Sequence, residues 1–246
     1  MFIQNEFCDG GSLQTLIEAH RAEARHFTEA ELRRLLRQVA AGLQYVHGRQ
    51  LAHLDVKPGN ILLCHAEHEL EADDQEAGDS LELRATYKLA DFGHVVPLYG
   101  EDVEPEEGDC RYMAPELLAL VIDRAKLTSA DIFSLGLTVF EAASLRVLPR
   151  NSLDSAEYAC LKGGLLPRLP HYSTHLNSLL ASMVRPEAEQ RPSAADILGS
   201  LATSEAAEAE DTRRWRLYRE LEQTREKLSV LENKLNIHSS SGGGRC

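Results

Sequence analysis

An ordered series of short motifs places the tightest constraint on how this chain can fold. The first is the stretch 53–60, which reads His-Leu-Asp-Val-Lys-Pro-Gly-Asn. After it come Asp91-Phe92-Gly93, Ala114-Pro115-Glu116, the stretch 131–136 (Asp-Ile-Phe-Ser-Leu-Gly) and Arg191-Pro192-Ser193. A single triplet of this kind recurs by chance and marks no more than a turn, whereas the full series in this order is specific because each match supports the next.

The acidic and amide residues of these motifs are suited to phosphoryl transfer. The reaction needs a carboxylate to orient the attacking hydroxyl, and oxygen ligands for the magnesium ions that neutralise the migrating phosphoryl group. Asp55 is the candidate for the catalytic carboxylate, and Asn60 and Asp91 are the candidates for the magnesium ligands. Lys57, two residues after Asp55, is suited to stabilise phosphate charge in the transition state. The motifs are therefore typical of a protein kinase that uses ATP and Mg²⁺.

The other motif residues are expected to have structural roles. They are His53, Phe92, Gly93, Glu116, Asp131 and Arg191. His53 is expected to be a packed histidine rather than an acid or a base. Similarity to kinases implies that Glu116 and Arg191, which are far apart in the sequence, form a buried ion pair. Removing one partner of such a pair typically costs about 3–5 kcal/mol.

Capping signals and apolar periodicity predict a mainly helical chain. Ser12 can cap a first helix, and Thr28 with Glu31 forms a capping box for a second helix that ends near residue 48. The same spacing at Thr128 and Asp131 predicts the start of a third helix, apolar nearly all round and hence buried. Shorter elements are expected as strands at 61–63 and 87–89 and as closing helices at 175–184 and 193–201.

The expected fold class is mainly α (α+β), a kinase-like large lobe with short β-strands around the catalytic loop, plus a C-terminal amphipathic helix. The expected segments are a hinge remnant at 1–11, the large lobe at 12–203, a linker or helical extension at 204–211, a coiled-coil-like helix at 212–237 and a flexible tail at 238–246. Inside the lobe, 65–83 is an acidic insert and 91–116 is the activation segment.

The 212–237 helix has the apolar spacing of a coiled coil. Its pattern consists of Leu217, Leu221, Thr224, Leu228, Leu231 and Leu235, in alternating four- and three-residue steps. About three heptads are marginal alone. Self-association and packing back on the lobe both remain open.

The first residues correspond to a kinase hinge. Similarity to kinases implies that backbone groups of Glu6 and Cys8 bond the adenine edge of ATP, with Asn5 at the gatekeeper position. The alternative for this stretch is that Gly10 and Gly11 simply form a loop.

Composition narrows the partners and the compartment. The net charge of -13 disfavours nucleic acid, because its phosphates would be repelled. The five cysteines are scattered, which indicates neither a disulfide framework nor a zinc site and fits a reduced compartment. There is no run of about 18 apolar residues, and we expect no membrane association. The expected location is the nucleus or the cytoplasm.

Less common features resemble the Wee-type mitosis-inhibitory kinases, from Ile3 to about Leu201. These features are the stretch 5–13 (Asn-Glu-Phe-Cys-Asp-Gly-Gly-Ser-Leu), Leu54, the acidic insert before Lys88, Gly93-His94-Val95, Glu107-Gly108-Asp109 ahead of Arg111-Tyr112, Leu148-Pro149-Arg150-Asn151 and the stretch 166–170 (Leu-Pro-Arg-Leu-Pro). The resemblance implies ATP-dependent phosphorylation of an inhibitory tyrosine on a cyclin-dependent kinase, which restrains mitotic entry, mostly in the nucleus. The motifs alone would favour a Ser/Thr acceptor, because Lys57 is typical of Ser/Thr-type loops.

The small lobe of a kinase is not recognisable in these 246 residues. A Gly-rich loop, a strand lysine and a helix glutamate are needed over the phosphates, and no G-x-G-x-x-G occurs. We therefore expect an N-terminally truncated form that is weakly active or inactive alone, with apolar surface exposed around Phe2, Ile3 and Leu63. The alternative is a non-catalytic interaction module that recruits a partner through 212–237.

The activation segment is predicted to be ordered without phosphorylation. Kinases that are switched there pair the new phosphate with arginines, one of which usually precedes the catalytic Asp, and here Leu54 takes that place. Residues 94–113 contain no Ser or Thr, so Tyr99 and Tyr112 are the only hydroxyl acceptors. Mass spectrometry of the active protein should find neither tyrosine stoichiometrically phosphorylated. Stoichiometric phosphate on either, with activity lost on its removal, would contradict the prediction.

Overall fold

The computed structural model describes residues 6–65, 85–99, 108–118, 123–150, 155–207, 209–210, 212–216 and 219. Asn5, nearly all of the acidic insert and most of the 212–237 helix lie outside the described residues. The chain divides into two compact units, Met1–Leu201 and Ala202–Cys246. None of the helices in the described ranges is long and apolar enough to cross a membrane.

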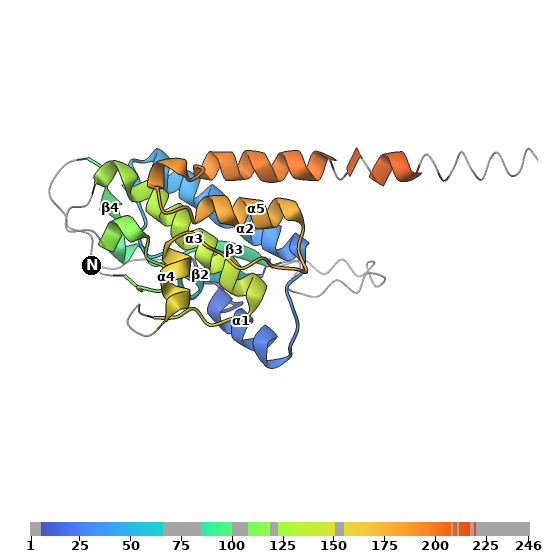
Figure 1. Ribbon diagram of the computed structural model, residues 1–246, viewed down its shortest axis with the longest axis horizontal. Coiled ribbons are helices and arrows are strands. Elements are labelled where there is room, and N and C mark those ends of the chain that lie inside the picture. The colour runs from blue at the N-terminus through green and yellow to red at the C-terminus, as the bar shows by residue number, and fades with distance from the viewer. Residues whose placement is uncertain are drawn as a thin grey trace, which may run out of the picture. The chain divides into compact units, whose positions relative to one another are not determined.

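The first unit is built mainly of helices (Figure 1). The α-helices are α1 (Leu13–Ala22), α2 (Glu29–Gly48), α3 (Leu127–Ser144), α4 (Ala156–Lys162) and α5 (Thr174–Met183), and residues 194–201 are also helical. Short 3-10 turns lie at Pro58–Asn60, Phe92–His94, Pro115–Leu118, Arg124–Lys126 and Ala188–Gln190. In the second unit the described residues 202–207, 209–210, 212–216 and 219 are helical.

Two of the helix starts have the predicted caps. The side chain of Ser12 accepts a hydrogen bond from the Thr15 amide at the start of α1. At the start of α2, Thr28 and Glu31 form the predicted reciprocal capping box. Each cap satisfies amide groups that have no partner within their own helix.

Within the described ranges, four short strands form two antiparallel pairs. β1 (Leu51–Ala52) pairs with β4 (Val96–Pro97), and β2 (Ile61–Cys64) pairs with β3 (Thr86–Leu89). The predicted strands at 61–63 and 87–89 are thus confirmed, and they lie against each other. The pairs bring the chain on either side of the catalytic loop next to the chain on either side of Asp91.

The start of the chain runs along β2. Gly10 donates to the Leu63 carbonyl and Leu63 donates to the Gly11 carbonyl, both at 2.9 Å. A Cβ at position 10 would lie 2.7 Å from the Cβ of Leu63, so only glycine fits this approach. The expected exposure of Leu63 is wrong, because its side chain is buried at 2% exposure beneath this crossing.

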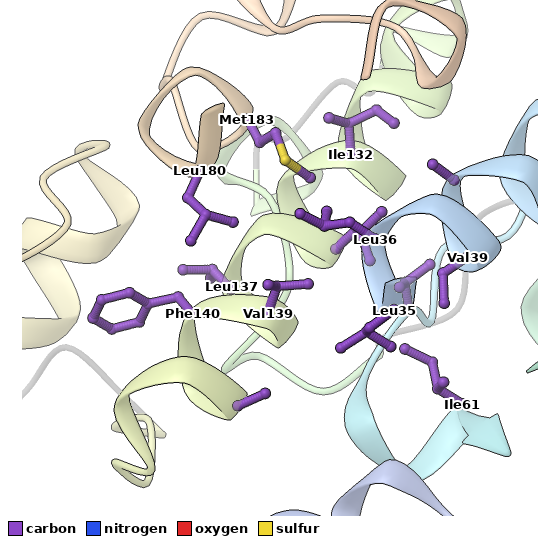
Figure 2. Close-up of a cluster of buried hydrophobic side chains, with 14 of the residues drawn as sticks. Leu35, Leu36, Val39, Ile61, Ile132, Leu137, Val139, Phe140, Leu180 and Met183 are labelled. Atoms are coloured by element: carbon purple, nitrogen blue, oxygen red, sulfur yellow. The ribbon is translucent and has the colours of Figure 1, made fainter. Parts of the chain in front are cut away.

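The hydrophobic core surrounds α3, as predicted from its apolar sequence. Figure 2 shows side chains of α3 packed with those of α2 and α5. The labelled core residues are Leu35, Leu36, Val39, Ile61, Ile132, Leu137, Val139, Phe140, Leu180 and Met183. Gly136 allows α5 to approach, since a Cβ there would lie 2.8 Å from Val184. A helix that is apolar nearly all round is stable only when other elements cover all its faces.

The predicted capping box at Thr128 and Asp131 is wrong. α3 begins at Leu127 and its first turn has no side-chain cap. Asp131 lies inside the helix and is 0% exposed, with its carboxylate bonded to the backbone of the catalytic loop. A buried carboxylate needs several donors, and the catalytic loop supplies them.

The predicted ion pair between Glu116 and Arg191 is confirmed. The two guanidinium nitrogens of Arg191 donate to the two carboxylate oxygens of Glu116 at 2.5 and 2.8 Å. The side chain of Arg191 is 0% exposed, and it also donates to the carbonyls of Ser129, Arg185 and Pro186. The pair ties the end of the activation segment to the beginning of α3 and to the chain after α5.

Replacing Glu116 should destabilise the fold strongly. Glu116→Ala leaves the buried guanidinium of Arg191 without its counterion, which typically costs about 3–5 kcal/mol. Urea unfolding should report this loss in the free energy of unfolding. The matched control is Glu189→Ala, which removes the ion pair between an exposed carboxylate and Lys126 and should change the free energy of unfolding far less, because solvent screens such a pair. Equal losses in the two variants would contradict the prediction.

Candidate active site

One buried carboxylate anchors the catalytic loop. Asp131 Oδ2 accepts from the His53 amide at 2.8 Å, and Oδ1 accepts from the Leu54 amide at 2.7 Å. The ring of His47 on α2 lies 2.8 Å from Oδ2. Leu54 has a φ of 63°, a left-handed conformation that costs of order 1–3 kcal/mol in a residue with a side chain. The two bonds to Asp131 hold the loop in this turn.

The three predicted catalytic-loop residues meet. Lys57 Nζ donates to Asp55 Oδ2 at 2.7 Å, and Asn60 Nδ2 donates to the same oxygen at 2.7 Å and to the Asp55 carbonyl at 2.9 Å. Asp55 is 4% exposed. Its carboxylate is thus fixed by two donors on Oδ2, which leaves Oδ1 as the oxygen that can accept a proton or orient a hydroxyl.

His53 has the structural role that the sequence predicts. It is 0% exposed, and its Nε2 lies 3.1 Å from the Ala90 carbonyl. Its ring packs edge-on against Phe92, with 5.2 Å between the centroids. Burial lowers the pKa of His53 from its ordinary value, against the opposing effects of Asp131 and the Ala90 carbonyl. The histidine therefore joins the catalytic loop to the Asp-Phe-Gly motif rather than acting as a base.

The two candidate magnesium ligands are connected through the backbone. The Ala90 amide donates to the Asn60 carbonyl at 2.9 Å, directly before Asp91. Because the Asn60 amide nitrogen is bonded to Asp55, its side-chain oxygen is available to a cation. Asp91 is exposed and has a φ of 62°. The donor set fits magnesium, which is usually bound by one or two side-chain oxygens together with substrate phosphates.

Gly108 of the activation segment lies on the Oδ1 side of Asp55. A Cβ on Gly108 would lie 3.4 Å from Asp55 Oδ1 and 3.3 Å from the Leu54 carbonyl. Asp109 next to it forms a two-pronged ion pair with Arg111, with N to O distances of 2.6 to 3.1 Å. The hydrogen bonds from Arg111 lower the pKa of Asp109 although burial opposes this.

Sequence reasoning noticed Gly108 and Asp109 only as family features and assigned them no place in the site. The sequence signal that could have identified these two residues is a glycine followed by a charged residue shortly before Ala114-Pro115-Glu116. Of the two tyrosines in 94–113, Tyr112 is 2% exposed and its hydroxyl donates to Glu141. Tyr99 is 76% exposed.

An open cavity adjoins the catalytic loop. It has a volume of about 400 Å³ and is lined by residues of α1, the catalytic loop and the activation segment, among them Lys57, Gly59, Asp109, Arg111 and Tyr112. The cavity thus lies between the catalytic loop, at Lys57 and Gly59, and the activation segment.

The predicted hinge residues are only partly described. Asn5 lies outside the described residues. The carboxylate of Glu6 accepts from Lys88 on β3 at 2.5 Å and from the thiol of Cys64 at 3.8 Å. Cys8 is half-buried. These contacts hold the start of the chain beside β2 and β3, and the adenine-binding role of Glu6 and Cys8 stays a prediction.

Comparison with known proteins gives the family. The protein kinase domain matches residues 1–201. A Wee1-like protein kinase 2 from Homo sapiens is 40% identical over 203 residues, which is 80% of this chain and 35% of that protein. The one from Danio rerio is 42% identical over 241 residues, or 92% of this chain and 44% of that protein. The chain belongs to the Wee-type protein kinases. A Wee1-like protein kinase from Drosophila melanogaster agrees, at 36% identity over 278 residues, covering 100% of this chain and 44% of the relative.

The Wee-type relatives are longer than the match. The chain spans between 35% and 44% of the three proteins just named. Membership confirms the predicted family, enzyme class and kinase-like fold. The activity, substrates and partners of a whole Wee-type protein are proposals for this chain.

The buried His53 should make stability depend on pH. Its folded pKa is below the ordinary 6.5, so the unfolded chain takes up the proton first. The free energy of unfolding is therefore undiminished by His53 above about pH 6.5. It decreases as the pH falls toward the lowered pKa, by at most about 1.4 kcal/mol per pH unit. Unfolding free energies measured across this range should fall less steeply in His53→Gln. The exposed His26 supplies the control, His26→Gln, and a slope for His53→Gln that equals the wild-type slope would contradict the prediction.

Proposed function

We propose that the protein is an ATP-dependent kinase of the Wee type that phosphorylates an inhibitory tyrosine on a cyclin-dependent kinase and so restrains mitotic entry. One observation carries the catalytic part of this proposal. Asp55 is buried, and Lys57 and Asn60 are bonded to the same carboxylate oxygen, which leaves Oδ1 toward Gly108. The substrate part is supported by the Wee1-like relatives.

Each residue has a definite task in this proposal. Asp55 Oδ1 accepts the hydrogen bond of the substrate hydroxyl and then its proton. The hydroxyl oxygen attacks the γ-phosphorus of ATP as the bond from that phosphorus to the β,γ-bridging oxygen breaks, and ADP leaves. Lys57 stabilises the charge on the transferred phosphoryl group. Asn60 and Asp91 would hold magnesium, which neutralises phosphate charge when it is bound.

The acceptor and the partner are the finer points of the proposal. Lys57 by itself fits a Ser/Thr acceptor, whereas the Wee-type family favours tyrosine. We place the activity in the nucleus, with the cytoplasm as the alternative, and we propose neither nucleic acid nor membrane as a partner. Adenine binding by Asn5, Glu6 and Cys8 and self-association through 212–237 belong to the same proposal.

The test is phosphorylation of a cyclin-dependent kinase by the protein isolated from its source cells. We expect magnesium-dependent phosphotyrosine on the substrate. Asp55→Asn should lower its rate about a hundredfold or more, because the positioned base is lost. The exposed Glu189 supplies the control, Glu189→Gln, which should keep the wild-type rate.

The same assay on the isolated 246-residue polypeptide separates the remaining possibilities. We expect little transfer and weak ATP binding, because its sequence has no G-x-G-x-x-G loop. Transfer at the rate of the cellular protein would contradict that expectation. Phosphoserine or phosphothreonine alone would contradict the tyrosine acceptor. A cellular protein that binds the substrate without any transfer sensitive to Asp55→Asn would favour the interaction module.

A further inference from the structure

All the carbonyl groups of residues 109–113 accept hydrogen bonds. The donors are the Tyr112 and Met113 amides to Asp109, the Tyr158 hydroxyl to Cys110, Lys162 to Arg111, Ser134 to Tyr112, and Lys162 again to Met113. Apart from the first bonds, every donor is a side chain of α3 or α4. The backbone of this part of the activation segment is thus fixed by the two helices behind it.

Lys162, at the end of α4, makes two of these bonds. Its Nζ donates to the Arg111 carbonyl at 3.0 Å and to the Met113 carbonyl at 2.5 Å. The same nitrogen lies 5.3 Å from the ring centre of Phe133 on α3 and 5.1 Å from that of Tyr158. The ammonium group therefore lies between two aromatic rings and donates its hydrogen bonds to the backbone of the activation segment.

The position of the segment gives these contacts a function. Gly108 lies against Asp55, and Asp109, Arg111 and Tyr112 line the cavity beside Lys57. Residues 108–113 therefore lie beside both the catalytic carboxylate and the cavity. Their backbone must be in place before the substrate arrives, since a misplacement of about 1 Å lowers catalysis strongly.

We propose that Lys162 is a positioning residue that holds residues 109–113 in the conformation that receives the protein substrate. It would do by hydrogen bonding what a phosphate with its arginine does in kinases that are switched by phosphorylation. The role in substrate reception rests on the proposed kinase function. The order that Lys162 gives to the segment can be measured without any phosphoryl transfer.

The charge of Lys162 adds a distinctive pH dependence. Burial lowers its pKa to about 8, although Cys110, Asp109 and Glu116 act in the opposite direction. Two other charged residues lie near Lys162. The guanidinium carbon of Arg191 lies 4.8 Å from the centre of the Phe133 ring, and the backbone carbonyl of Arg111 accepts one of the hydrogen bonds from Lys162. When the segment opens, the lysine meets water and regains its ordinary pKa of 10.5. The closed segment therefore binds fewer protons and is favoured as the pH rises from about 8 toward 10.5.

Hydrogen exchange on the full 246-residue chain tests the proposal. The Arg111, Tyr112 and Met113 amides are hydrogen-bonded within the segment and report its opening. Lys162→Met keeps the stem and removes both bonds, so these amides should exchange about tenfold faster or more. Lys162→Arg, which can donate again, should restore most of the protection. Lys126→Met removes a partly exposed lysine that pairs with Glu189 and should leave exchange in 109–113 unchanged.

The pH dependence distinguishes Lys162 from a residue that only fills space. After correction for intrinsic exchange, opening in the wild type should decrease between about pH 8 and pH 9, by at most about tenfold. In Lys162→Met this decrease should disappear. Wild-type exchange in Lys162→Met at neutral pH, or an unchanged pH dependence, would overturn the proposal. If Lys162→Met fails to fold by circular dichroism, Lys162→Gln replaces it, with the same two criteria.

A kinetic measurement on the cellular protein completes the test. Lys162→Met should raise the KM for the protein substrate about tenfold and leave the KM for ATP unchanged. Equal changes in the two constants would overturn the substrate-receiving role. If the wild-type protein transfers no phosphate, the proposed kinase function fails by that result, and the exchange data still decide whether Lys162 orders the segment.

Discussion

The bond between the Asp131 carboxylate and the backbone of the catalytic loop is the interaction on which the rest of the site depends. Asp131 is fully buried in α3 and receives the amides of His53 and Leu54. A buried carboxylate is costly unless donors surround it, and a left-handed Leu54 is costly unless its surroundings fix it. The two amides give the carboxylate its donors, and the carboxylate fixes the left-handed turn at Leu54. As a result Asp55, the next residue, has a single defined position.

α3 organises the activation segment from the same core. Ser134 and Glu141 hold the backbone and the hydroxyl of Tyr112, while the Phe133 ring lies beside the cations of Arg191 and Lys162. Cations are attracted to aromatic faces, more so where water is excluded. A helix covered on every face by other elements is a rigid support, and the groups bonded to it are held by the fold.

The order and spacing of the motifs predicted the catalytic loop, and the similarity to kinases implied the Glu116 to Arg191 pair, which the structure contains. Spacing failed where one residue type has two uses. Asp131 three residues after Thr128 has the spacing of a cap, and only the arrival of the catalytic loop at the buried side of α3 gives its carboxylate a better set of donors. The expected exposure of Leu63 has a different origin, the unrecognised small lobe, and it is wrong because the crossing of Gly10 over Leu63 is not a local property of the sequence.

The sequence by itself determined the family, the chemical identity of the site residues and the starts of α1 and α2, because these depend on residue type and on spacing over a few positions. The tertiary structure decided which donors surround Asp131, how close Gly108 lies to Asp55 and which groups donate hydrogen bonds to the carbonyls of 109–113. Lys162 stands 49 residues from Met113, and no local pattern links them. Contacts of that kind arise only when packed helices bring distant side chains into a space from which water is excluded.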